Sequence, residues 1–252
     1  MVTTKNGFLD NLWESAARSE VVFSSEPAAN LPDVARRYLE HAIAPGTPLA
    51  SAVRLRMHGE IKLRRRWRPF RAEQVLCRGR EMIWNATVRM NGLPIRGFDR
   101  LVNGAGAMQW RLLGIIPLVS ASGPDITRSA LGRVAGESVW LPSALCSGEA
   151  VTWTASSPNS VQANFLTGDE PAKLTLTVDE RGRLQTVSLP RWGNPEGAAF
   201  HYADFGGFVE QENTFAGYTI PTRLRLGWHF GTDRFEPEGE FFRVTIDGAT
   251  YR

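Results

Sequence analysis

Long hydrophobic runs and paired cysteines are both missing from this sequence of 252 residues. No apolar stretch approaches the roughly 20 residues that a membrane-spanning helix needs, so we expect no membrane span. The N-terminus has no charged region followed by an apolar run, a pattern that predicts no signal peptide and a cytoplasmic protein. The two cysteines, Cys77 and Cys146, lie far apart and match no metal or redox spacing, which is typical of a reducing compartment.

The sequence motifs that bind cofactors are also missing. It has no phosphate-binding glycine loop, no His-x-Glu metal pair, no nucleophile elbow and no dinucleotide fingerprint. We therefore expect no metal and no cofactor. The net charge is only +3, and Arg64–Arg71 is a single basic run, which argues against nucleic acid as a partner.

Alternation of apolar and polar residues dominates the chain from Ala52 onward, which is the two-residue period of half-buried strands. The clearest run, Met82–Met90, ends at Asn91-Gly92, the strongest short hairpin signal. Such short turns require antiparallel neighbours, and they divide the chain into about 11 or 12 strands. A sheet this wide must curl or close to protect its edges. The predicted fold is mainly β, with a single large antiparallel sheet curled into an open or closed barrel.

Two helical patterns accompany the strands. The first spans residues 31–44, with Asn30 as its cap. The second spans 125–141, with Asp125 as N-cap and Pro142 as its end. We expect one or two helices lodged against the inner face or mouth of the sheet. The predicted organisation is an irregular or short helical segment over 1–29, followed by one curled β domain over 30–252 with helix 125–141 inserted.

Three small residues, Ser129, Gly132 and Gly136, form a stripe along the second helix. Each glycine inside a helix costs about 1 kcal/mol relative to alanine, so some other interaction should offset it. Close approach of the sheet is one explanation, and a smooth wall beside a ligand is the other.

Tryptophan is abundant, with eight residues, and several tryptophans share their strand parity with methionines. Tryptophan and methionine suit an irregular apolar pocket, because methionine adapts its shape and tryptophan carries an N–H at one edge. A filled β core is the alternative interpretation. The residues predicted to bind a substrate are Trp84, Trp110, Trp140, Trp228, Met82, Met108, Arg133 and Arg191.

Acid–base chemistry without a cofactor is the remaining enzymatic option. The candidate catalytic residues are Glu137, Asp99, His229 and Glu240. A carboxyl group walled by Trp and Met would have its pKa raised by desolvation. Pairing of Glu137 with Arg133, one helical turn away, would instead favour a structural role. We expect Arg191 in a loop at a strand end, where it is suited to fix an anionic group by a two-pronged hydrogen bond.

A family resemblance rests on GESVWLPSAL at residues 136–145 and on three further segments: PDVARRYLEHAI, GYTIPTRLRLGWHFGTD and GEFFRVTIDGATYR. Together they resemble a bacterial domain family of unknown function over Leu31–Arg252, and this resemblance implies no particular activity. The predicted curled sheet with its lodged helix is similar to the lipoprotein carriers of the LolA and LolB type. That second resemblance implies an open barrel able to hold acyl chains.

Three functions remain open at this point. The first is an enzyme of the lyase, isomerase, cyclase or hydrolase type, acting on an apolar or amphipathic substrate in the Trp/Met-lined cavity. The second is a non-catalytic binding protein or carrier for a lipid-like ligand. The third is a structural or interaction domain with a filled core. The first two differ in whether a carboxyl group faces the cavity and is free to react.

Overall fold

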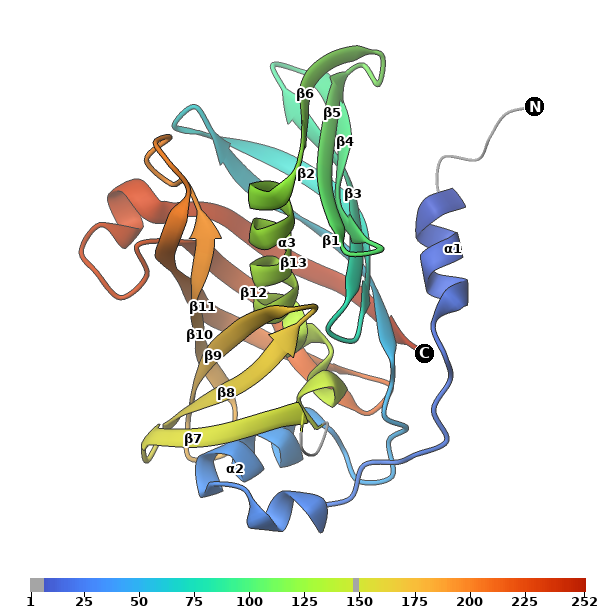
Figure 1. Cartoon of the computed structure of the whole chain (residues 1–252), viewed down its shortest axis with the longest axis vertical. Helices are drawn as coiled ribbons and strands as arrows, with labels where there is room; N and C mark the ends of the chain where they lie inside the picture. The colour runs from blue at the N-terminus through green and yellow to red at the C-terminus, as the bar shows by residue number, and fades with distance from the viewer. Residues whose placement is uncertain (1–6, 147–149) are drawn as a thin grey trace.

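Thirteen strands dominate the computed structural model, which describes residues 7–146 and 150–252 (Figure 1). The strands are β1 (Ala52–Leu63), β2 (Arg66–Cys77), β3 (Glu81–Met90), β4 (Leu93–Val102), β5 (Ala105–Leu112), β6 (Ile116–Ser122), β7 (Val151–Ser157), β8 (Ser160–Thr167), β9 (Glu170–Val178), β10 (Leu184–Gly193), β11 (His201–Phe215), β12 (Tyr218–Trp228) and β13 (Glu240–Tyr251). The helices are α1 (Gly7–Ser15), α2 (Asp33–Ala42) and α3 (Pro124–Glu137), with short helical turns η1 (Pro27–Asn30), η2 (Ser138–Trp140), η3 (Pro142–Cys146) and η5 (Phe235–Gly239).

All thirteen strands belong to one antiparallel sheet with the order β6-β5-β4-β3-β2-β1-β13-β12-β11-β10-β9-β8-β7. The mainly β prediction and the single curled sheet are confirmed. The sheet is open, because β6 and β7 form its two edges and do not pair with each other. Helix α3 connects these two edge strands along the chain and packs against β5 on one side and β9 and β10 on the other. In Figure 1 it stands upright inside the curl of the sheet.

Local sequence explains most of the strand boundaries. Asn91 and Gly92 both have positive φ, 51° and 82°, as the turn between β3 and β4 requires. The structure has thirteen strands where the pattern indicated about 11 or 12, and β6 is a strand that alternation does not reveal. Its sequence does not alternate, because six of its seven residues are exposed on the edge of the sheet.

The core lies between the inner face of the sheet and the helices. Helix α2 buries Val34, Tyr38 and Leu39 at one end of this core. Helix α1 packs on the other face of the sheet, where Leu9 and Leu12 form a small cluster with residues of β2 and β3. Residues 1–6 of the predicted N-terminal segment lie outside the described residues.

The helix boundaries differ from those predicted. Asp125 is not the N-cap of α3, since Gly123 occupies that position with a φ of 110°. The Asp125 carboxylate instead accepts a hydrogen bond of 2.9 Å from Trp192 Nε1. The α-helix ends at Glu137 rather than 141, because the chain tightens into the 3-10 turn η2. Asn30 does not cap α2, which begins at Asp33 after Pro32.

Candidate functional site

A cavity of about 880 Å³ lies between α3 and the inner face of the sheet. Its walls come from β1 to β6 on one side, from β10 to β13 on the other, and from the C-terminal half of α3 with η2. This volume lies within the range of small-molecule sites. The cavity extends to turn residues such as Arg64 and Asn91, so it reaches the end of the molecule where the β1–β2 and β3–β4 hairpins turn.

Aromatic side chains form most of the apolar wall. Trp84 and Trp110 lie with ring centroids 5.7 Å apart, and Phe242 lies 6.0 Å from Trp84. Trp228 packs edge-to-face on Phe205 at 5.2 Å across the cavity wall of β11 and β12. Trp84, Trp110 and Trp228 therefore border one interior, as their strand parity predicts.

The remaining apolar lining completes this wall. Met108 lines the cavity, as does Met90. Trp140 also lines it from η2, although its indole N–H is already bonded to the carbonyl of Pro221 at 3.0 Å. The indole N–H of Trp84 has no hydrogen-bond partner among the described residues, although Trp84 is only 2% exposed.

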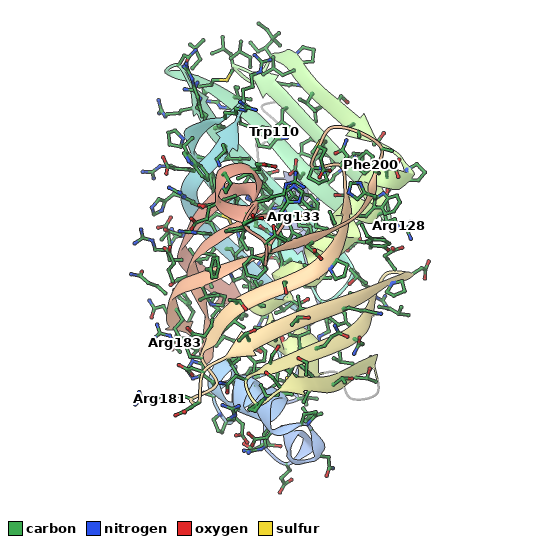
Figure 2. All side chains as sticks on the ribbon, turned by 90° about the vertical axis from the view of Figure 1, so that its left-hand side faces the viewer. Trp110, Arg128, Arg133, Arg181, Arg183 and Phe200 are labelled. Atoms are coloured by element: carbon green, nitrogen blue, oxygen red, sulfur yellow. The ribbon has the colours of Figure 1, made fainter. Side chains whose placement is uncertain are left out.

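A charged cluster connects α3 to the sheet inside this apolar wall. Arg133 Nη1 donates to Asp99 at 3.0 Å and Arg133 Nε donates to Glu137 at 2.7 Å. The second oxygen of Glu137 accepts from Gln74 at 2.5 Å, and the second oxygen of Asp99 accepts from Trp110 Nε1 at 3.1 Å. Each oxygen of both carboxyl groups therefore has a donor. Figure 2 labels Arg133 and Trp110 in the region between the two halves of the sheet.

The apolar wall affects the ionisation of Asp99. Burial raises the pKa of Asp99 above its usual value, an effect that the charge of Arg133 and the hydrogen bond from Trp110 only partly offset. Asp99 therefore holds a proton more readily than an exposed aspartate does.

The prediction that Arg191 lies in a loop is wrong, because Arg191 belongs to strand β10, from which its guanidinium lines the cavity in an environment different from that of Arg133. It lies over the rings of Phe205 and Trp228, at 4.7 Å and 5.3 Å from their centroids. Its polar contacts are long ones, 3.3 Å and 3.5 Å, to the carbonyl and hydroxyl oxygens of Ser129. No carboxylate of the described residues lies within 4.0 Å of it. Burial and the charge of Arg133 lower the pKa of Arg191 to about 10, so it remains a cation at neutral pH.

The small-residue stripe of α3 makes room for Arg191. A Cβ at Gly132 would lie 2.9 Å from Cγ of Arg191, whereas Gly136 lines the cavity directly. Ser129 supplies the oxygens that Arg191 contacts. Both explanations of the stripe therefore apply, because it allows a close approach of β10 at one position and forms a smooth wall at another.

Three of the predicted site residues do not line the cavity. Met82 shares the parity of Trp84 but lies two residues earlier in β3, where it is fully buried in the core. His229 follows the end of β12 with a φ of 57° and lies 3.5 Å from Glu196. Glu240 is 3% exposed and paired with Arg243 at 2.6 Å and Arg225 at 3.6 Å. Glu240 pairs with Gly227 next to a register shift between Leu226 and Gly227, so simple alternation does not carry across that part of the sheet.

Sequence reasoning missed several residues of the site. Gln74 is fully buried and holds Glu137, and its strand parity with Ala72 and Leu76 was the signal that it points inward. Phe242 lines the cavity, as do Arg64, Arg66 and Arg68 at its rim. The basic run was considered only as a nucleic-acid signal.

Within 7–146 and 150–252, no three His, Cys, Asp or Glu side chains are grouped so that they could hold a metal ion. In the same residues, no helix is long and apolar enough to cross a membrane.

Solved structures with a similar fold include proteins of Nitrosomonas europaea and Desulfovibrio piger. The LolA superfamily protein of Nitrosomonas europaea is 9% identical, with a TM-score of 0.46, 87% of this chain covered and 92% of that one. A DUF1329 family protein of Desulfovibrio piger is 11% identical, with a TM-score of 0.41, 87% of this chain covered and 90% of that one. At such values the likenesses say nothing about a ligand.

The family of the chain follows from its sequence. No curated protein matches it. A family of unknown function, DUF6920, matches residues 29–251, which is nearly the whole chain. The protein therefore belongs to the DUF6920 family.

Proposed function

We propose that this protein binds an amphipathic small molecule with an anionic head group and does not transform it. The apolar body of the ligand lies against the aromatic wall of the cavity, and its anionic group binds the guanidinium of Arg191. The single observation that carries the proposal is that Arg191 is a cation on an apolar cavity wall with no carboxylate partner among the described residues. A buried charge is costly unless it is paired, and an anionic ligand would pair it.

The distribution of charge on the wall supports an anion rather than a cation. Arg133 is shared between Asp99 and Glu137. Five arginines and two carboxyl groups line the cavity, so the lining carries three excess positive charges when all of them are ionised. Burial raises the pKa of Asp99, and protonation of Asp99 would add one more positive charge to the lining. The guanidinium of Arg191, whose polar contacts are only the long ones to Ser129, is suited to bind a carboxylate or phosphate.

The arrangement of Glu137 argues against the catalytic interpretation. Both of its oxygens accept hydrogen bonds, one from Arg133 and one from Gln74, so neither is free to accept a proton from a substrate without breaking the cluster. A cofactor-independent acid–base enzyme remains the second candidate function for one reason. Asp99 borders the cavity and has a raised pKa, which is what a general acid near neutral pH requires.

Competitive displacement of a fluorescent fatty acid from the full chain tests the binding proposal. We expect dodecanoic acid to displace the probe much more effectively than dodecanol, which has the same chain but no charge. A hydrogen bond to a charged group contributes about 1.5–3 kcal/mol, so Arg191→Gln should weaken dodecanoate binding roughly 10- to 100-fold. The same variant should leave dodecanol binding nearly unchanged.

Arg181→Gln is the matched control, since Arg181 is an exposed arginine in the β9–β10 turn, at the edge of the molecule in Figure 2. It should bind dodecanoate as the unaltered protein does. Equal affinity for the acid and the alcohol, or an Arg191→Gln variant that binds the acid normally, would refute the head-group assignment. Failure of the protein to bind either molecule would refute the proposed function as a whole.

A further inference from the structure

Three hairpin turns lie at one end of the sheet, beside the mouth of the cavity. They connect β1 to β2 at residues 64–65, β3 to β4 at 91–92, and β5 to β6 at 113–115. These six strands are neighbours in the order β6-β5-β4-β3-β2-β1 and alternate in direction, so every second turn falls at the same end. Figure 1 shows the β5–β6 hairpin rising above the rest of the sheet at the top of the view. We call these three turns and their flanking residues the mouth hairpins.

Large aliphatic side chains are exposed on the mouth hairpins. Ile115 is 75% exposed and Ile116 is 53% exposed, and the other four are Leu93, Leu113, Leu118 and Val119. Six of the twelve large hydrophobic residues that are exposed among the described residues therefore lie in this one region. Leu118 and Val119 also line the cavity, so the exposed apolar surface continues from the β5–β6 hairpin into the cavity. A contiguous exposed apolar surface of this kind marks an interaction site.

In two of these turns, residues other than glycine and asparagine adopt the left-handed backbone conformation. Arg64 and Arg65 have φ values of 48° and 65°, and Leu113 has a φ of 56°. Such left-handed positions favour Gly and Asn, because a side chain there brings Cβ close to the following carbonyl. All three side chains are exposed, so no packing within the protein compensates for the strain. An observed strain of this kind points to a function for the residues that bear it.

The apolar surface is surrounded by arginines. Six of them are exposed at this end of the sheet: Arg64, Arg65, Arg66, Arg89, Arg96 and Arg111. None lies within 4.0 Å of a carboxylate of the described residues. Arg96 and Arg111 are directly opposite each other on β4 and β5, and like charges in that arrangement are destabilising. The region thus has a strong positive charge that nothing in the described part of the chain neutralises.

From these observations we propose that the mouth hairpins dock the protein on the surface of an anionic lipid bilayer, with the cavity mouth facing the lipid. The exposed isoleucines and leucines enter the interface, and the arginines contact the anionic head groups. Charge complementarity selects this partner, since aliphatic tips ringed by unpaired cations match a surface that is apolar below and negative above. The proposal is independent of the ligand proposed for the cavity, because Ile115, Ile116, Arg96 and Arg111 do not line it.

Co-sedimentation of the full chain with lipid vesicles tests this docking. We expect binding to vesicles of phosphatidylcholine mixed with phosphatidylserine, much weaker binding to pure phosphatidylcholine, and loss of binding at high salt. Each arginine near an anionic surface strengthens binding about five-fold, so Arg96→Gln combined with Arg111→Gln should weaken it roughly 25-fold. Ile115→Ser combined with Ile116→Ser should weaken it by about ten-fold or more. Because all four residues are exposed, these variants should fold normally and keep their dodecanoate affinity.

Two controls carry the same changes at the far end of the molecule. Leu166 is 62% exposed near Gly79, in the turn at the opposite end of β2 and β3, and Arg181 lies in the β9–β10 turn. Leu166→Ser and Arg181→Gln should bind vesicles as the unaltered protein does.

A further variant separates docking from stability. Arg65→Gly removes the strain at a left-handed position, so it should raise the melting temperature while weakening vesicle binding about five-fold. Equal binding to charged and neutral vesicles, binding to neither, or normal vesicle binding by the arginine and isoleucine variants would overturn the proposal. So would a protein dimer that the isoleucine variants abolish in the absence of any vesicle binding, since the surface would then belong to a second copy. Normal dodecanoate binding alongside absent vesicle binding would overturn the docking proposal alone.

Discussion

Glu137→Gln separates a structural role of the charged cluster from a catalytic one. In the protein, Glu137 accepts from Arg133 Nε at 2.7 Å and from Gln74 at 2.5 Å, and its side chain is 12% exposed. Glutamine has the same size, but it has no charge and only one accepting oxygen. One of the two donors therefore loses its partner, and Arg133 keeps only Asp99 as a counter-charge.

The magnitude follows from these contacts. Removing one partner of a fully buried ion pair costs about 3–5 kcal/mol. Here Arg133 keeps its bond to Asp99, and one hydrogen bond to position 137 persists, so the loss is closer to a single charged hydrogen bond, about 2 kcal/mol. For a chain of this size, about 2 kcal/mol lowers the melting temperature by roughly 4–8 °C.

Thermal unfolding and fatty-acid displacement on the same samples provide the assay. We expect Glu137→Gln to melt lower yet to bind dodecanoate more tightly, because removal of a negative charge makes the wall more positive. The control is Glu14→Gln, which removes an exposed partner of Arg252 and should cost less than about 1 kcal/mol. An unchanged melting temperature would refute the structural role of the cluster, and weaker dodecanoate binding would refute the electrostatic reasoning.

Three further variants test other parts of the argument. Gly132→Ala should gain about 1 kcal/mol of helix propensity but displace Arg191, so calorimetry should show no net stabilisation and displacement should show weaker dodecanoate binding. Leu113→Asn should raise the free energy of unfolding by about 1 kcal/mol, measured in urea, because asparagine tolerates positive φ. The raised pKa of Asp99 means that its contribution to stability is present below its unfolded pKa and is lost as pH rises through the folded value. Binding of dodecanesulfonate, whose charge does not titrate, should strengthen as pH falls through that range, and Asp99→Asn should remove this dependence.

Periodicity was sufficient to predict the architecture and one wall of the cavity. Trp84 and Trp110 share parity on strands with clean alternation and regular turns, so their side chains necessarily reach the same face. The position of Glu137 on the last turn of a helix that packs inside the sheet was also predictable, as was its pairing with Arg133 four residues earlier.

The residues that were misplaced lie where alternation fails. Glu240 lies between a π-helical turn and a register shift, and His229 lies beyond the last ladder pair of β12. Met82 has the correct parity but the wrong depth, and parity contains no information on how far along a strand a cavity extends. The sequence pattern does not show which group a buried side chain contacts. Neither the hydrogen bond between Gln74 and Glu137 nor the lack of a carboxylate partner for Arg191 was therefore predictable from the sequence.

The energetics of the charged cluster favour a role in binding over a role in folding. Buried ion pairs contribute little to stability, and hydrophobic residues of similar volume often replace them with no loss or with a gain of about 1–4 kcal/mol. The wall around Asp99, Arg133 and Glu137 is apolar and would accept such residues readily. Leucine or methionine at these three positions would also fill the space and allow α3 to pack directly against the sheet, which would remove much of the cavity. The cluster instead fixes a charged group between helix and sheet, with the ring of Trp84 5.0 Å from the guanidinium of Arg133, and it leaves Arg191 unpaired nearby. An arrangement that forgoes stability in order to keep a cavity open and positively charged is what a site for an anionic amphiphile requires.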